Sequence, residues 1–491
     1  MRTYYSRILF ILGVMIFTSC SQNEVLNSLP AKQLCVQTRN FISSSEEEDY
    51  KVSNQMLWDY LRLVKKADKV ENTLPLIREG DTLAYCVQYT QGWDVISGDQ
   101  RLSPTMMTSD NGEFETSASG IYDSSVEGLL SYIKSIRNSN NTEKNSIWSF
   151  LKPKVRCENL ATYSTNDNEG YVVGMWIPED TIYEENTIKI PHILETQWWQ
   201  DTPWNQYTPL KIDTLGNLVN AKVGCNVVAV AQIIYSFRKN NPRDCILPTA
   251  LRPLKDVSEL PDISTFTTGI WKEMAESMNS AEGMDYTAAY LAYLGQNIMG
   301  VTYGAESTVV DMSDLRSALN WAKLSYTESS SYSFSTVLAY VRNGSPVCIH
   351  SLMESNSATE GKTNVHYFLI DRYKIESNDI KMHCRWNDSY KVSEEEYNSN
   401  PPELFVPNGE DEMDITLSQE TRTYFGMKWG NTYCTKDDVF YLVRTQTAAS
   451  FDEAGEIPPT DHIYTPYWSS PLGTTGAVRN MVYNFAEKVS E

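Results

Sequence analysis

The stretch AKVGCNVVAVAQII, residues 221–234, places a glycine and a cysteine directly before a long apolar run. The dozen residues after Gly224 contain neither proline nor glycine, so they predict a buried helix that begins at Cys225. The N-terminus of a helix lowers the pKa of a thiol through its unpaired N–H groups. Cys225 is therefore a candidate nucleophile, and the alternative is a small buried hydrophobe. Position alone does not decide between the two.

The length and charge of the chain limit the classes of protein to consider. The chain has 491 residues, so two or more domains are expected, and its hydrophobic content of 41% is enough for sizeable cores. Its formal charge of −22 argues against nucleic acid as a partner, because phosphates would be repelled. The nine cysteines show no spacing typical of a structural zinc site.

The N-terminus has the features of a targeting segment. Arg2 and Arg7 supply a basic region, the apolar run 8–17 is too short to span a bilayer, and small residues lead up to Cys20. The segment resembles a bacterial lipoprotein signal, and the alternative is an ordinary secretory signal cut nearby. We therefore expect a signal peptide over residues 1–20. The rest of the protein would be an exported cell-envelope lipoprotein at the outer membrane or cell surface, tethered through a lipidated Cys20.

The first unit, residues 21–180, reads as a small α+β domain. Apolar periodicity predicts helices over 52–67 and 126–136, and alternation within 83–95 predicts strand structure. The polar, acidic stretches 165–170 and 178–186 are predicted to be a linker.

The second unit, residues 181–491, is predicted to place helices first and strands later. The expected elements are helices after Gly224 and over 286–299, and strands over 347–350, 366–371 and 440–444. This order favours an α+β domain with a helical half and a sheet-rich half.

Two further residues could serve a nucleophilic Cys225. His366 begins a predicted strand directly after a polar stretch, where a side chain is expected to be both exposed and rigidly held. Its distance from Cys225 along the chain is in the range used by papain-like proteases. The alternative is a satisfied core histidine. Gln200 lies upstream of Cys225, and its carboxamide could donate to an oxyanion.

The motifs around these residues resemble the streptopain-like cysteine peptidases. TQWWQDTPWN, residues 196–205, is similar to the family's TxWxQxxPYN, and GCNVVAVAQIIY, from Gly224, is similar to GCxATAxAQIMxY. MGVTYG, residues 299–304, and HYFLID, residues 366–371, resemble the family's GVxVxxxYG and GHAFVIDGY. Upstream, GWDVISGDQR, residues 92–101, is similar to the GGFVIVSxDxR signature of the family's inhibitory propeptide.

The resemblance implies a papain-like, two-lobed peptidase domain preceded by a prodomain that keeps it latent. It implies that Cys225 attacks a peptide carbonyl and that His366 forms an ion pair with it and protonates the leaving amine. Gln200 and the Cys225 N–H would bind the oxyanion, and Trp429 would flank His366. No metal or organic cofactor is needed. The implied partners are protein or peptide substrates and the chain's own prodomain.

The sequence departs from the family pattern around the histidine. Val365 and Arg372 replace two glycines, and in the better match to the family's NWGWGG motif Lys428 replaces Asn and Asn431 replaces the second Trp. Trp386 is a rival to Trp429. These departures motivate a second hypothesis, a catalytically impaired surface lipoprotein that keeps the peptidase fold as a binding or inhibitory protein. A third, weaker hypothesis is another acyl transfer, such as transglutamination.

Overall fold

The computed structural model describes most of the chain from Tyr50 onward. The described residues are 50–114, 124–140, 142–145, 147–148, 151, 161–167, 170–241, 268–309, 311–353, 364–392, 412–430, 439–448, 451–452, 455–456, 460–463 and 477–488. The predicted signal peptide and Cys20 lie outside them. Within the described residues, no helix is both long and apolar enough to cross a membrane.

A single large sheet runs through the protein and joins its two ends. Its main path has the order β1-β2-β3-β4-β13-β12-β11-β10-β17-β9, while β5, β6 and β16 (Thr460–Ile463) pair outside this path. The result is a mixed α/β fold in which strands far apart in the sequence share one backbone hydrogen-bond network.

The described part of the N-terminal unit contains strands β1 to β4 and the α-helices α2 and α3. Its elements are α2 (Asn54–Leu63), β1 (Val70–Arg78), β2 (Asp81–Tyr89), β3 (Trp93–Ser97), β4 (Thr105–Ser109) and α3 (Ser124–Arg137). Helix α2 begins where the Ser53 side chain accepts a hydrogen bond from the Met56 N–H at 3.2 Å, and it buries Leu57, Tyr60 and Leu61. Both helices and the strand predicted in this region are confirmed.

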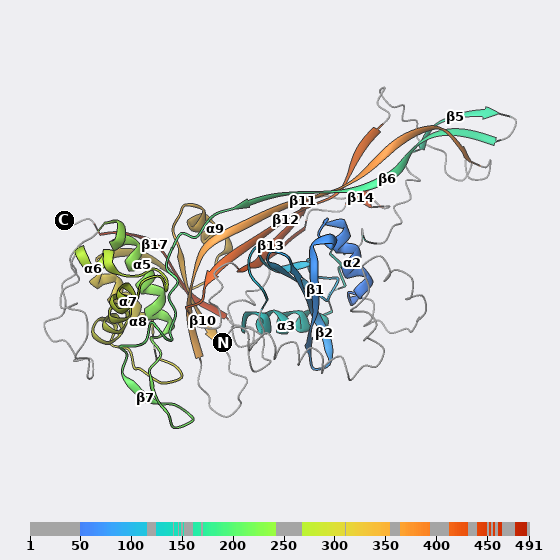
Figure 1. Ribbon diagram of the computed structural model, residues 1–491. Helices are drawn as coiled ribbons and strands as arrows, with labels where there is room; N and C mark the ends of the chain where they lie inside the picture. The colour runs from blue at the N-terminus through green and yellow to red at the C-terminus, as the bar shows by residue number, and fades with distance from the viewer. Residues whose placement is uncertain are drawn as a thin grey trace.

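Four helices form a cluster at one end of the molecule (Figure 1). They are α5 (Cys225–Asn240), α6 (Thr268–Glu273), α7 (Ala281–Tyr293), which continues as a π-helix over Leu294–Met299, and α8 (Met312–Trp321). Helix α5 is buried along nearly its whole length, which explains why its sequence is apolar on every side. The predicted helix that begins at Cys225 is confirmed.

The strands that follow β4 along the sheet extend to its other edge at β9. They are β9 (Leu324–Ser329), β10 (Val347–Met353), β11 (Asn364–Val392), β12 (Glu412–Lys428), β13 (Val439–Ala448) and β17 (Ala477–Glu487), with helix α9 (Phe334–Arg342) against them. The three predicted strands correspond to β10, β11 and β13, and helices α5 to α8 precede them, although α9 follows strand β9.

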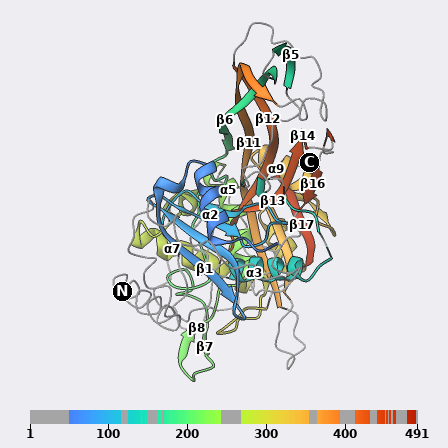
Figure 2. The same cartoon turned by 90° about the vertical axis from the view of Figure 1, so that its right-hand side faces the viewer.

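The predicted linker is wrong, because both polar stretches are strands. β5 (Ala161–Asp167) and β6 (Gly170–Lys189) pair with each other, and β6 pairs with β11 from Lys189↔Lys374 to Tyr171↔Val392. The backbone of a polar segment is satisfied as well by a sheet partner as by water. Together with the far ends of β11 and β12, these strands project beyond the N-terminal unit in both views (Figures 1 and 2).

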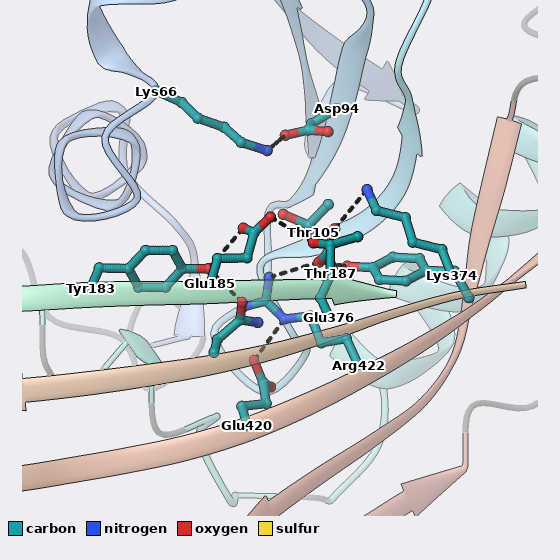
Figure 3. Close-up of polar contacts among 12 residues, drawn as sticks. Lys66, Asp94, Thr105, Tyr183, Glu185, Thr187, Lys374, Glu376, Glu420 and Arg422 are labelled. Carbon is teal, nitrogen blue, oxygen red and sulfur yellow. Dashed lines mark hydrogen bonds and ion pairs between the residues drawn. The ribbon is translucent and has the colours of Figure 1, made fainter. Parts of the chain in front are cut away.

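The N-terminal unit packs on the middle of β6, β11 and β12. Strand β4 pairs with β13, Ser109↔Val439 to Met107↔Tyr441, and one hydrophobic core contains side chains of both parts. A buried polar network completes the interface (Figure 3). In it, the Glu376 carboxylate lies 2.7 Å from the Lys374 ammonium, and the Arg422 guanidinium donates to the Glu420 carboxylate at 2.6 Å.

Candidate active site

Cys225 is the first residue of α5. Gly224 precedes it with φ of 105°, a conformation that favours glycine, and so permits the sharp entry into the helix. The Val223 N–H donates to the Gln200 carbonyl at 3.0 Å, which fixes the Gln200 segment beside this entry. The backbone of Gln200 is therefore held two residues before Cys225.

The Cys225 thiol is buried against strand β11. The N–H of Tyr367 is directed at the Cys225 Sγ at 3.4 Å. Burial raises the pKa of the thiol to about 11, although backbone N–H groups, including that of Tyr367, favour the thiolate. In this structure the group is therefore a neutral thiol at neutral pH.

His366 lies next to Tyr367 on β11 and is also buried, with 5% of its surface exposed. Its ring stacks on Trp429, with centroids 5.9 Å apart and an interplanar angle of 22°, and it also stacks on Phe368. Burial lowers the pKa of His366 to about 4, while a hydrogen bond with the Trp429 backbone favours the protonated ring. The prediction that this histidine is exposed is wrong, because Phe368 and Trp429 cover it.

The thiol and the imidazole approach β11 from opposite faces. Successive side chains of a strand alternate between its faces. Tyr367 and Leu369 pack in the core that contains α5, whereas Phe368 packs in the other core with Trp429. Among the described contacts, no hydrogen bond or ion pair joins the Cys225 Sγ to the His366 ring, so the backbone brings the two residues together before their reactive atoms meet.

Trp429 follows the last residue of β12 and is 2% exposed. Gly430 comes next with φ of 66°, and a Cβ there would lie 3.2 Å from a methyl carbon of Val228 on α5, so the turn packs closely on the helix. The rival Trp386 is paired with Trp176 in the projecting part of β11 and β6. Of the two tryptophans, the structure brings Trp429 to His366.

Lys428, one of the departures from the family pattern, makes specific polar contacts. The Lys428 ammonium donates to the Thr196 carbonyl at 2.8 Å and lies 3.9 Å from the Asp371 carboxylate. Asp371 also lies 2.9 Å from Nδ1 of His192, so these groups fasten the segment upstream of Gln200 to the sheet.

The other departures lie close by. Arg372 is buried with its guanidinium 4.3 Å from the ring centroid of Phe440, and Val365 pairs with Leu352. Asn431 lies outside the described residues.

Two tyrosines near the site were not singled out from the sequence. Tyr367 contacts the thiol through its backbone, and the alternation of the strand that begins at His366 could have indicated that it faces α5. Tyr441 on β13 accepts a hydrogen bond from the Trp429 indole, and no sequence motif marks it. Within the described part of the chain, no group of three or more His, Cys, Asp or Glu residues is arranged to hold a metal ion.

Comparison with known proteins gives one family match. Residues 198–390 match the Peptidase C10 family, a range that includes Gln200, Cys225 and His366 but not Trp429. None of the curated proteins matches the chain.

Two solved structures are similar to parts of the chain. A fragment of Prevotella intermedia prointerpain A is 16% identical, with a TM-score of 0.41, over 84% of this chain and 97% of the fragment. Active Prevotella intermedia interpain A cysteine protease is 21% identical, with a TM-score of 0.28, over 40% of this chain and 80% of that one. Because both TM-scores are low, the assignment rests on the family match: the chain carries a region, residues 198–390, that matches the Peptidase C10 family, and it is a streptopain-like cysteine peptidase.

Proposed function

We propose that the protein is an exported, lipid-anchored cysteine endopeptidase made as a latent precursor. Cys225 is its nucleophile, His366 its general base and acid, and Gln200 with the Cys225 N–H its oxyanion site. The observation that carries the proposal is the position of the Cys225 Sγ, at the N-terminus of a buried helix and 3.4 Å from the backbone nitrogen next to His366.

The chemistry follows from these groups. The Cys225 thiol transfers its proton to His366, and the thiolate attacks the peptide carbonyl carbon. The oxyanion accepts hydrogen bonds from the Gln200 amide and the Cys225 N–H, and the imidazolium then protonates the leaving amine. Water hydrolyses the acyl-enzyme and regenerates the thiol. Trp429 shields the imidazole from solvent, and none of these steps requires a metal or an organic cofactor.

Latency is supported by the protonation state of the site. The pKa of Cys225 is raised to about 11 and that of His366 lowered to about 4, so both groups are neutral at pH 7. The N-terminal unit acts as the inhibitory prodomain in a papain-like, two-lobed arrangement. It packs on β11 and β12, the strands that lead to His366 and Trp429. Its removal would free those strand ends to bring the imidazole to the thiol.

The test compares the full chain with single variants, activated by limited trypsin digestion without separation of the fragments. We expect Cys225→Ala to abolish hydrolysis of denatured protein and labelling by an epoxide thiol trap, and His366→Gln to lower turnover by roughly 10³-fold or more. Cys384→Ala is the matched control, because this thiol is buried on the same strand as His366, paired with Met413 and away from α5. Hydrolysis by Cys225→Ala at the parent rate would refute the proposal.

The same assay separates the alternatives. If the protein is a catalytically impaired binding protein, the parent chain should be folded after digestion but show no turnover. An acyl transferase would produce amine-exchanged products in place of hydrolysed ones. For localisation, a Cys20→Ala variant should lose membrane attachment when cell fractions are compared.

A further inference from the structure

We infer that Tyr441 is a positioning residue for His366, acting through the Trp429 indole. The inference deepens the proposed function and rests on it, since it assumes that His366 serves Cys225. Tyr441 lies on β13, one strand away from the turn that carries Trp429, and is 2% exposed.

The first contact fixes the indole. The Trp429 Nε1–H donates to the Tyr441 hydroxyl at 3.0 Å, and the two rings meet edge to face with centroids 5.8 Å apart. An indole has one polar atom and can only donate, so this bond meets its whole requirement for a partner. The angle of the tryptophan about its side-chain bonds is therefore set by Tyr441.

The second contact is between Trp429 and His366, and it orients the histidine. Trp429 touches His366 twice, through the stacked rings and through a hydrogen bond that its backbone accepts from the His366 ring. The His366 Nε2 has no hydrogen-bond partner in the described structure, so the backbone bond is made by Nδ1. The arrangement thus leaves Nε2 as the nitrogen that exchanges protons.

The substitution at Lys428 makes this second contact more important. Lys428 stands where the family motif has Asn, and its ammonium donates to the Thr196 carbonyl. It is therefore engaged with the segment before Gln200. The backbone and ring of Trp429, held by Tyr441, supply the orientation that an amide side chain would otherwise give.

The strand pairing also links Tyr441 to the N-terminal unit. On one side of β13, Tyr441 pairs with Phe425 of β12, and on the other side with Met107 of β4. The N-terminal unit is therefore hydrogen-bonded to β13, the strand that carries Tyr441.

The experiment uses Tyr441→Phe, which keeps the ring and removes the hydroxyl that accepts from Trp429. Tyr290→Phe is the matched control, because its buried hydroxyl donates to the Ala231 carbonyl at 3.4 Å within the helical cluster. In the trypsin-activated full chain, we expect Tyr441→Phe to lower kcat about 5- to 30-fold with KM within twofold, and to shift the pH limb assigned to His366. Tyr290→Phe should change neither kcat nor the pH profile.

A readout independent of activity is NMR of the intact Cys225→Ala chain with labelled histidine and tryptophan. Tyr441→Phe should move the His366 ring and Trp429 indole resonances, and Tyr290→Phe should leave both in place. If Tyr441→Phe does not fold, the double variant Trp429→Phe/Tyr441→Phe removes the donor and the acceptor of this bond together. It should match Trp429→Phe alone in kcat and pH profile, and an additional loss in the double variant would count against the inference.

The outcomes separate the inference from the proposed function. An active His366→Gln variant would refute the proposed role of the histidine. An inactive His366→Gln, together with a Tyr441→Phe variant that matches Tyr290→Phe in kcat, pH profile and resonances, would overturn only the positioning role.

Discussion

Ionisable groups are buried at two places along strands β11 and β12, and their charge states differ between the two places. In the middle of the strands, under the N-terminal unit, the charges are paired: Glu376 with Lys374 at 2.7 Å, and Arg422 with Glu420 at 2.6 Å. Burial opposes ionisation of Glu376, yet Lys374 and Arg422 hold its pKa below the ordinary value. At the strand ends, Cys225 and His366 are buried without such partners and are neutral.

The difference shows what the active site lacks in this state. Burial by itself favours the neutral form of any ionisable group, and a charge persists inside a protein only where an opposite charge is close. The interface under the N-terminal unit meets this condition, whereas the thiol and the imidazole do not. In the proposed mechanism, formation of an ion pair between Cys225 and His366 therefore requires a change of structure at the strand ends, and the middle of the strands can stay as it is.

The largest expected effect comes from breaking the charged region. Arg422→Met would leave the buried carboxylates of Glu376 and Glu420 with less compensation, so we expect the free energy of unfolding to fall by about 3–5 kcal/mol. Arg316→Met is the control, because its pair with Glu328 is at the surface and should contribute about 1 kcal/mol or less. Denaturant unfolding of the full chain measures both, and equal losses would contradict the comparison.

A smaller effect is expected from the neutral region as the pH falls. The pKa of His366 is about 4 in the folded chain against 6.5 ordinarily, so between these values the unfolded chain binds the additional proton. The parent should lose stability as pH falls through this window, and His366→Gln should remove that dependence, a difference of up to about 3 kcal/mol.

His383→Gln provides a control of opposite sign. Its hydrogen bond with Asp414 raises the pKa of His383, so the stability it contributes is present at low pH and lost as pH rises. Unfolding curves measured from pH 4 to 8 should separate the two histidines. A His366→Gln variant whose pH dependence matches the parent would contradict burial of a neutral imidazole.

The smallest expected effect concerns the thiol. Because the pKa of Cys225 is about 11, its thiolate fraction and hence its alkylation rate in the intact chain should rise about tenfold per pH unit between pH 7 and 10. Peptide mass spectrometry after iodoacetamide treatment would follow this one residue. A rate independent of pH would mean that the ion pair already exists before activation.

The local elements of this protein could be predicted from its sequence. The apolar run after Gly224 allows only a buried helix, and the alternation at 366–371 gives a strand. Cys225, Gln200, His366 and Trp429 were singled out because motifs keep their order and spacing. These are local patterns, which the chain expresses regardless of what packs against it.

The remaining features depend on partners distant in the sequence. β6 reads as a polar linker until β11 supplies the matching backbone groups. His366 follows a polar stretch and so reads as exposed, yet Trp429, which covers it, lies far along the chain. The hydrogen bond between His192 and Asp371 likewise joins residues far apart in the sequence. No local periodicity encodes such contacts.

The pairing of β6 with β11 bears on what a cut in the precursor would release. β6 precedes the family match at residue 198 and yet is hydrogen-bonded along the strand that begins beside the active site. Backbone pairs survive the loss of one peptide bond, so a cut within residues 170–189 would produce a nicked complex whose fragments remain associated. A cut upstream of β5 would instead leave β5 and β6 in the peptidase chain, still paired with β11 at the edge of its sheet.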